Sequence, residues 1–221
     1  MKYLVFILIF LSMTSCIEII DDLSFKSDGS GTFKYTVNLS ASKVKVNSIL
    51  ALDSLDGKKI PSIQEIKDKI SKYKELISQK EGISNVKVES DFTNFVLKFQ
   101  CDFASITALQ KAIKEIAIDE SKTKKEIENS WLTWEGNRLI RSVPSITGDL
   151  TTRLKKEDIE GLKKGNYVSI TRFDRTIEKC ENTVSQISAN KMAVMVKMTP
   201  FALIQNVHLL DNSILLSDKK P

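Results

Sequence analysis

The sequence predicts an α+β fold, in which an antiparallel sheet built from hairpins is covered on one face by two to three amphipathic helices. Two observations carry this prediction. Apolar residues alternate at period two on both sides of several short turns, which is typical of β-hairpins. Longer segments between the hairpins carry apolar residues at helical spacing. The chain has 221 residues, 42% hydrophobic and 28% charged, which is typical of a globular protein.

The first hairpin is predicted around the turn 27–31. Most odd-numbered positions are apolar over residues 17–25 and again over 33–39, so each strand has one apolar face. The turn contains Gly29 and Gly31. We expect both glycines to adopt positive φ angles there, because no helix follows them to form a phosphate-binding βα unit.

The clearest helix is predicted over residues 63–77. Ser62 and Glu65 form a capping-box pattern at its start, apolar residues follow at helical spacing, and Gly82 ends the segment. Ser105 opens a second amphipathic pattern, and a shorter one precedes Gly165. These two helices are predicted over residues 105–116 and 156–163.

Short apolar runs predict the remaining strands. They cover residues 83–90, 93–103, 131–135, 138–143, 167–173, 176–180, 183–188 and 192–198. The last run is apolar on both faces, so we expect it to be a central strand. Charged residues are frequent over 119–130. This segment is predicted as an exposed loop or sub-domain boundary within a single domain spanning 16–221.

Residues 1–15 have the features of a secretory signal peptide. Lys2 gives a positive start, residues 3–11 form an apolar run, and small polar residues precede Cys16. The run is too short to span a bilayer, which needs about 20 apolar residues. An exported protein is therefore predicted, with the signal removed from the mature chain.

A signal peptide followed directly by Cys16 resembles that of a bacterial lipoprotein precursor, although Met13 stands where that motif usually has leucine. The resemblance implies that Cys16 becomes the diacylated first residue, carrying chains such as palmitate, and binds the protein to a membrane of the bacterial cell envelope. Ile17 stands where an inner-membrane retention signal would have aspartate, which favours the outer membrane. An ordinary secreted protein is the alternative.

The predicted strand begins at Ile17, directly after the lipidated residue. Most lipoproteins have a flexible polar tether at this point, and here there is little room for one. We therefore expect the domain to lie close to the bilayer surface.

The opening hairpin, Ile-Glu-Ile-Ile at 17–20 followed by Lys-Ser-Asp-Gly-Ser-Gly-Thr-Phe-Lys-Tyr-Thr-Val at 26–37, resembles the start of uncharacterised Bacteroidetes lipoproteins. It is also similar to the mycobacterial LppM-type lipoprotein domain, an α+β module. These are hairpin patterns, so the resemblance implies a fold class and assigns no functional residue.

Two cysteines remain once Cys16 is lipidated. Export permits a disulfide between Cys101 and Cys180, and such a bond would close a long loop. The alternative is that both thiols are free, since Cys101 lies on the apolar face of its predicted strand.

The candidates for catalysis are few. His208 is the only histidine, so paired-histidine metal sites are excluded, and we interpret it as a half-buried packing residue. Asp21, Asp22 and Asp91 are the carboxylates nearest strand ends. Asp21 interrupts an apolar face and is interpreted as an edge-strand or bulge position, with a site residue as the alternative. No catalytic, metal or cofactor motif is recognised.

The predicted function is that of a non-enzymatic binding or interaction module. The net charge of +5 falls to +4 without Lys2, and lysines alternate with acids, so no nucleic-acid partner is expected. The expected partners are the membrane, through Cys16, and an unknown envelope protein or lipidic ligand. A carboxylate-dependent hydrolase is the alternative. A roomy apolar pocket would favour ligand binding, whereas converging carboxylates would favour catalysis.

Overall fold

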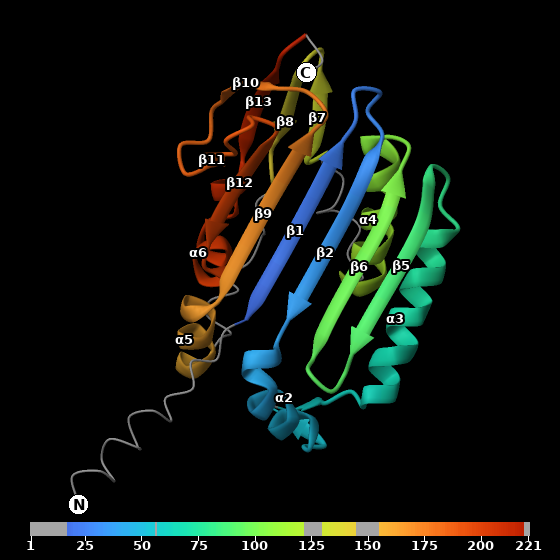
Figure 1. The fold of residues 1–221 in the computed structure, drawn as a ribbon. Helices are drawn as coiled ribbons and strands as arrows, with labels where there is room; N and C mark the ends of the chain where they lie inside the picture. The colour runs from blue at the N-terminus through green and yellow to red at the C-terminus, as the bar shows by residue number, and fades with distance from the viewer. Residues whose placement is uncertain (1–16, 56, 122–129, 145–154, 219–221) are drawn as a thin grey trace, which may run out of the picture.

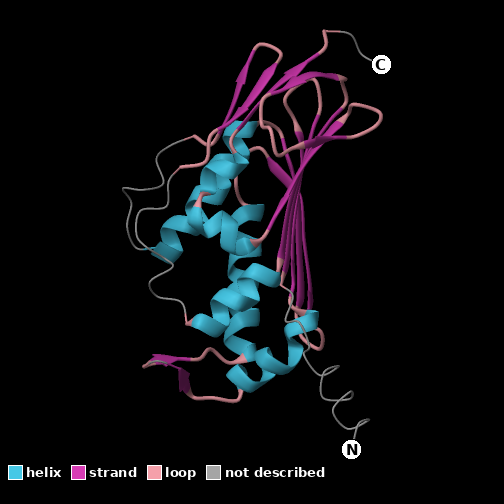
Figure 2. Ribbon diagram, turned by 90° about the vertical axis from the view of Figure 1, so that its left-hand side faces the viewer, coloured by secondary structure: helices cyan, strands magenta, loops and turns pink. Residues whose placement is uncertain are grey.

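The computed structural model describes residues 17–55, 57–121, 130–144 and 155–218. They form a seven-stranded sheet, a four-stranded sheet and a two-stranded hairpin. The helices lie along one face of the large sheet and around its lower end (Figure 1 and Figure 2). The fold is α+β, as predicted.

The large sheet is mixed, whereas an antiparallel sheet was predicted. Every neighbouring pair is antiparallel except the central pair β1 and β9, which runs parallel. Strand β12 was predicted to be central. It lies instead next to the edge of the sheet, where the two-residue β11 is the edge strand. In spatial order the strands are β11 (Gln186–Ile187), β12 (Ala193–Met198), β9 (Asn166–Phe173), β1 (Glu18–Phe25), β2 (Gly31–Asn38), β6 (Val96–Phe103) and β5 (Ile83–Asp91).

The first hairpin forms with the predicted pattern, and its glycines have different roles. Gly29 has a φ of +82°, as expected for this turn. Gly31 is required by packing instead: a Cβ atom there would lie 2.0 Å from the carbonyl oxygen of Ser24 and 2.5 Å from the ring of Phe103. The expectation of a positive φ at Gly31 is therefore wrong.

The small sheet extends the core beyond the upper end of the large one. Its strands, in spatial order, are β10 (Ile177–Cys180), β13 (Asn212–Leu216), β8 (Arg138–Arg141) and β7 (Leu132–Glu135). Leu132, Leu139 and Ile214 from this sheet belong to the same buried cluster as Leu23 and Phe25 of β1. The two sheets thus share one hydrophobic core.

Helices α3 and α4 cover the large sheet on the side of β5. The predicted capping box is present: the Glu65 amide donates to Ser62 Oγ at 3.1 Å, and the Ser62 amide donates to Glu65 Oε2 at 2.7 Å. Helix α4 continues into the predicted loop at 119–130, and residues 122–129 lie outside the described residues. The helices are α2 (Lys43–Leu50), α3 (Ile63–Ser78), α4 (Ile106–Ser121), α5 (Lys156–Lys164) and α6 (Pro200–Gln205), with 3₁₀ turns η1 (Ser40–Ser42) and η4 (Val207–Leu210) and the small hairpin β3 (Ser54–Leu55) and β4 (Lys58–Lys59).

Candidate functional site

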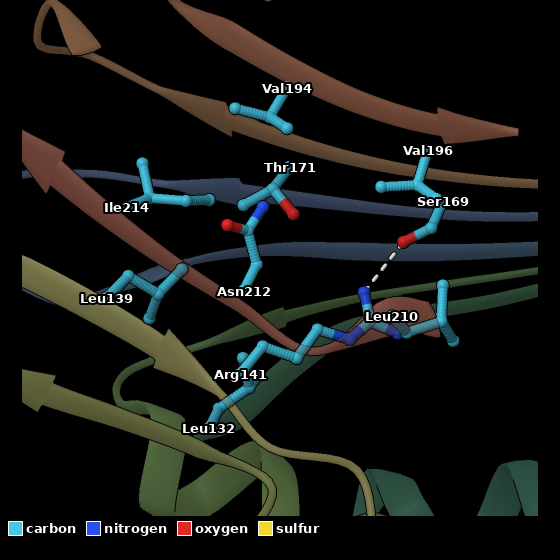
Figure 3. Close-up of a pocket in the computed structure, with 10 residues that line it drawn as sticks. All are labelled: Leu132, Leu139, Arg141, Ser169, Thr171, Val194, Val196, Leu210, Asn212 and Ile214. Carbon is cyan, nitrogen blue, oxygen red and sulfur yellow. Dashed lines mark hydrogen bonds between the residues drawn. The ribbon is translucent and has the colours of Figure 1, made fainter. Parts of the chain in front are cut away.

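A buried polar cluster forms around Asp21, whose relative exposure is 4%. Strand β1 pairs with β2 on one side and β9 on the other, so the predicted edge or bulge position of Asp21 is wrong. Ser169 Oγ donates to Asp21 Oδ1 at 2.8 Å, and the Tyr167 hydroxyl donates to Oδ2. Arg141 of the small sheet places Nη1 2.6 Å from Ser169 Oγ, as Figure 3 shows, and 3.5 Å from Asp21 Oδ1.

The cluster has little room for a substrate. The cavity beside Arg141 and Ser169 measures about 10 Å³, which is about the space of one water molecule. Burial, together with the Asp21 charge, raises the pKa of both Tyr35 and Tyr167, so both phenols stay protonated at neutral pH. We interpret the cluster as an ion pair that joins the two sheets.

The carboxylates singled out in the sequence do not come together. Asp22 projects from the opposite face of β1, where Arg172 Nε lies 3.0 Å from its carboxylate. Asp91 is the last residue of β5, and its Oδ1 accepts from the Thr93 and Asn94 amides of the following turn.

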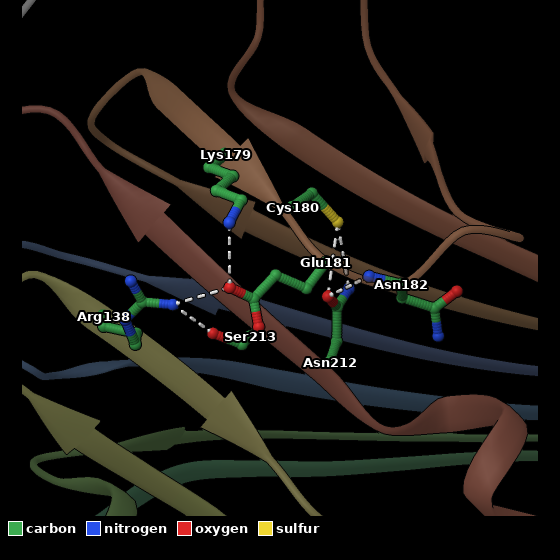
Figure 4. A network of polar contacts seen from close by, with 7 residues as sticks. All are labelled: Arg138, Lys179, Cys180, Glu181, Asn182, Asn212 and Ser213. Carbon is green, nitrogen blue, oxygen red and sulfur yellow. Dashed lines mark hydrogen bonds and ion pairs between the residues drawn. The ribbon is translucent and has the colours of Figure 1, made fainter.

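The structure leaves both cysteines free, so the candidate disulfide is not formed in it. Cys101 is buried on β6 of the large sheet, and burial raises the pKa of its thiol to about 12. Cys180 lies on β10 of the small sheet, where its Sγ is 3.2 Å from Asn212 Nδ2 (Figure 4). Cys16 and the predicted signal lie outside the described residues.

The polar network next to Cys180 is a surface ion cluster. Glu181 is 3.2 Å from both Lys179 Nζ and Arg138 Nη1, and hydrogen bonds from these two cations lower the pKa of Glu181. His208 is exposed, not half-buried as predicted, and its Nδ1 lies 2.8 Å from Asp211 Oδ2. Among the described residues, no three His, Cys, Asp or Glu side chains are grouped so as to hold a metal.

An apolar groove of about 240 Å³ lies at the end of the large sheet where β1 begins. A larger hollow of about 370 Å³, beside Gly31, Gly82 and Asp102, has a more polar lining. Strands β2, β5 and β6 form the floor of the apolar groove, and α2 and α3 form its walls. Its volume lies below the range of about 300–1,000 Å³ typical of pockets for drug-sized molecules. The lining residues are Val37, Leu39, Val46, Leu50, Ile66, Ile70, Ser90, Asp91, Phe92, Phe95, Val96 and Leu97.

Helical spacing directs the wall residues into the groove. Val46 and Leu50 are four residues apart on α2, and Ile66 and Ile70 are four apart on α3, so each pair shares one helix face. None of the apolar lining side chains reaches full burial, and α2 buries none of its residues. The groove therefore leaves apolar surface unfilled at this end of the core.

Phe95 enters the groove from a backbone conformation that is unusual for a bulky residue. Its φ is +55°, in the left-handed region that costs about 1 kcal/mol or more outside glycine. The Phe95 carbonyl accepts from the Leu39 amide at 2.9 Å, which holds the turn against the end of β2. A strained residue held in this way is typical of binding sites.

The groove was not predicted from the sequence. The apolar stripe along 63–77 predicted a buried helix face, but on α3 only Ile77, at the far end of the helix, is buried. Periodicity identifies which face is apolar. It does not say whether the sheet opposite comes close enough to fill the space.

One solved structure with a similar fold is the folded domain of LppM from Mycobacterium tuberculosis, determined by NMR; it is 11% identical, with 94% of this chain and 93% of that chain covered and a TM-score of 0.43. This likeness concerns fold alone. No family model and no curated protein matches the sequence. None of the helices in the described ranges is both long and apolar enough to cross a bilayer.

Proposed function

We propose that this protein is a lipid-anchored module of the bacterial envelope, in the outer membrane, that binds an apolar or lipidic ligand without chemical conversion. The observation that carries the proposal is the apolar groove between α2, α3 and the sheet. Filling it removes apolar surface from water, at about 25 cal/mol per Å². The carboxylate arrangement that a hydrolase requires has no counterpart in the groove, where Asp91 is the one acid among the lining residues.

The position of Ile17 supports a domain that lies close to the proposed anchor. Its carbonyl accepts from the Asn166 amide at 2.7 Å, so the residue after Cys16 is already bonded to the sheet. A Cβ atom on Gly165 would lie 2.8 Å from the same carbonyl oxygen, which shows how closely the chain packs there. With Cys16 acylated, the lower end of the domain would be held at the bilayer surface.

Binding of cis-parinaric acid, a fatty acid that fluoresces in apolar surroundings, tests the groove. The mature chain carrying Cys16→Ser lacks the acyl groups and avoids detergent. We expect it to enhance the probe's fluorescence, and Val46→Trp, which fills the groove from α2, to weaken binding at least tenfold.

Val184→Trp is the matched control, because Val184 is exposed in the β10–β11 connection, outside the groove. It should bind the probe like the parent protein. Equal binding by Val46→Trp and Val184→Trp, or no enhancement by the parent, would contradict the proposed groove function.

A further inference from the structure

Exposed apolar side chains gather at one end of the molecule. Six large hydrophobic side chains are exposed among the described residues, and four of them lie between residues 44 and 63. Single exposed apolar residues are normal, whereas a group of them marks an interaction site. We term this group the tip surface; it consists of Val44, Leu52, Leu55 and Ile63, which are 82%, 46%, 36% and 38% exposed.

The tip surface lies at the end of the domain where β1 begins. Glu18 pairs with Asn38, and only four residues separate Asn38 from the first residue of α2. The small hairpin β3–β4 and the start of α3 lie at this same lower end in both ribbon views (Figure 1 and Figure 2). Acyl chains on Cys16 would therefore enter the bilayer beside the tip surface.

Lysines flank the apolar side chains of the tip surface. Residues 43–63 contain four lysines, at 43, 45, 58 and 59, against two aspartates, at 53 and 56. Two of these lysines form exposed ion pairs with acids outside the segment: Lys45 Nζ lies 2.8 Å from Asp158 and Lys59 Nζ lies 2.6 Å from Glu65. Lysines beside exposed apolar side chains are typical of segments that lie in the membrane interface. There the apolar groups insert while the ammonium groups stay near the headgroups.

We propose that the tip surface docks onto the lipid bilayer next to the acylated Cys16. This rests on the anchoring part of the proposed function and specifies which face of the domain meets the lipid. Helix α2 links the two sites, because Val44 faces outward while Val46 and Leu50 line the groove. The groove then lies directly above the bilayer, so an apolar ligand reaches it without crossing bulk water.

Fluorescence quenching by brominated lipids tests the docking. The acylated protein is reconstituted into vesicles of phosphatidylcholine and phosphatidylglycerol with bromine on the acyl chains. Ile63→Trp places a reporter at the tip surface. Ile187→Trp is the matched control, because Ile187 is 45% exposed on β11 and lies away from the tip surface. Ile187 pairs with Val194, and Val194 pairs with Thr171. Thr171 in turn pairs with Leu23, in the upper half of β1.

The natural tryptophans give an internal baseline, because Trp134 packs on Phe25 at the far end of β1. We expect clear quenching for Ile63→Trp, and for Ile187→Trp no more than for the unsubstituted protein. Equal quenching of the two variants in protein that floats with the vesicles would overturn the docking surface and leave the anchor intact. Protein that does not float would overturn both. If the fluorescence of Ile63→Trp is blue-shifted but not quenched, the docking onto lipid is overturned in favour of a protein partner or a second copy.

Discussion

At the scale of single residues, the Asp21–Arg141 pair is the main electrostatic feature of the interior. Removing two charges from water is costly, and their attraction offsets that cost only when hydrogen bonds satisfy the remaining polar atoms. Asp21 has these bonds from Tyr167 and Ser169. On Arg141, the buried Nε has no hydrogen-bond partner among the described residues, so we infer that the pair contributes more to how the two sheets meet than to net stability. The sequence could not predict it, because Arg141 is 120 residues away from Asp21.

Breaking this pair should be strongly destabilising. Arg141→Met leaves the Asp21 carboxylate buried without its cation, and we expect a loss of about 3–5 kcal/mol in the free energy of unfolding. Urea unfolding of the mature chain measures it. Arg172→Met is the control, since the Arg172 side chain is 50% exposed where it pairs with Asp22; it should cost less than about 1 kcal/mol. Similar losses for both variants would contradict a buried structural pair.

The buried thiol of Cys101 predicts a loss of stability at alkaline pH. Burial raises the pKa of Cys101 to about 12, whereas an unfolded cysteine has a pKa of about 8.5. The stabilising contribution is complete below pH 8.5 and is lost as the pH rises towards 12, because the unfolded chain releases the proton first.

The expected slope from this single site is about 1.4 kcal/mol per pH unit above the unfolded pKa. Urea unfolding at pH 8, 9 and 10 measures it. Cys101→Ala should be less stable at pH 8, because it loses packing, but its stability should fall less steeply over the same range. Parallel pH dependence in the two proteins would rule out this role for Cys101.

At the scale of elements, local signals predicted the helix and hairpin positions well. The capping box placed the start of α3 at the correct residue, and the alternating patterns found β1 and β2. Such signals are local because a cap or a tight turn involves only neighbouring residues. The groove was not predicted because it is not a local feature. The gap between α2 and the sheet depends on how several elements pack together.

The capping box should be measurable on its own. Ser62→Ala removes the side-chain oxygen that accepts from the Glu65 amide, and we expect it to lower the free energy of unfolding by about 1 kcal/mol. Ser71→Ala, at an exposed position inside the same helix, should be neutral or slightly stabilising, because alanine is the better helix former. A neutral Ser62→Ala would show that α3 is held by packing alone.

The groove wall and the core helix should differ in their contribution to stability. Leu109 of α4 is 1% exposed, so Leu109→Ala should cost about 2–5 kcal/mol. Leu50 of α2 is only half-buried against the groove, and Leu50→Ala should cost clearly less while weakening binding of cis-parinaric acid. A loss at Leu50 equal to that at Leu109 would mean that the groove is closed core.

At the scale of the whole molecule, the sequence predicted the class of the fold but not the parallel strand pair at the centre of the large sheet. Pairing between neighbouring strands, as in β5 and β6, leaves a pattern in one stretch of sequence. The parallel pairing of Glu18 with Asn166 leaves no such pattern, because the sequence of each strand is compatible with many different partner strands. The structure therefore differs from the predicted antiparallel sheet at its centre, where one pair is parallel, and in its division into separate sheets.

The central position of β1 predicts its resistance to opening. In hydrogen exchange of the mature chain, peptides covering 18–25 should exchange only on global unfolding. Peptides covering 83–91, on the edge strand β5, should exchange faster. Mass spectrometry of the exchanged protein measures both. Rapid exchange at 18–25 would mean that the chain after Cys16 is a flexible tether, against the proposed position at the bilayer surface.

If the protein is exported as proposed, the parallel β1–β9 pair also sets the order in which the large sheet is completed. A chain that crosses the membrane amino end first delivers β1 early and β9 only after residue 173 has passed. Until then one edge of β1 has unpaired backbone groups, and such an edge invites pairing with other chains. On the proposed anchoring, the strand closest to the lipid would be completed late, and the protein would first stand at the membrane with one open sheet edge.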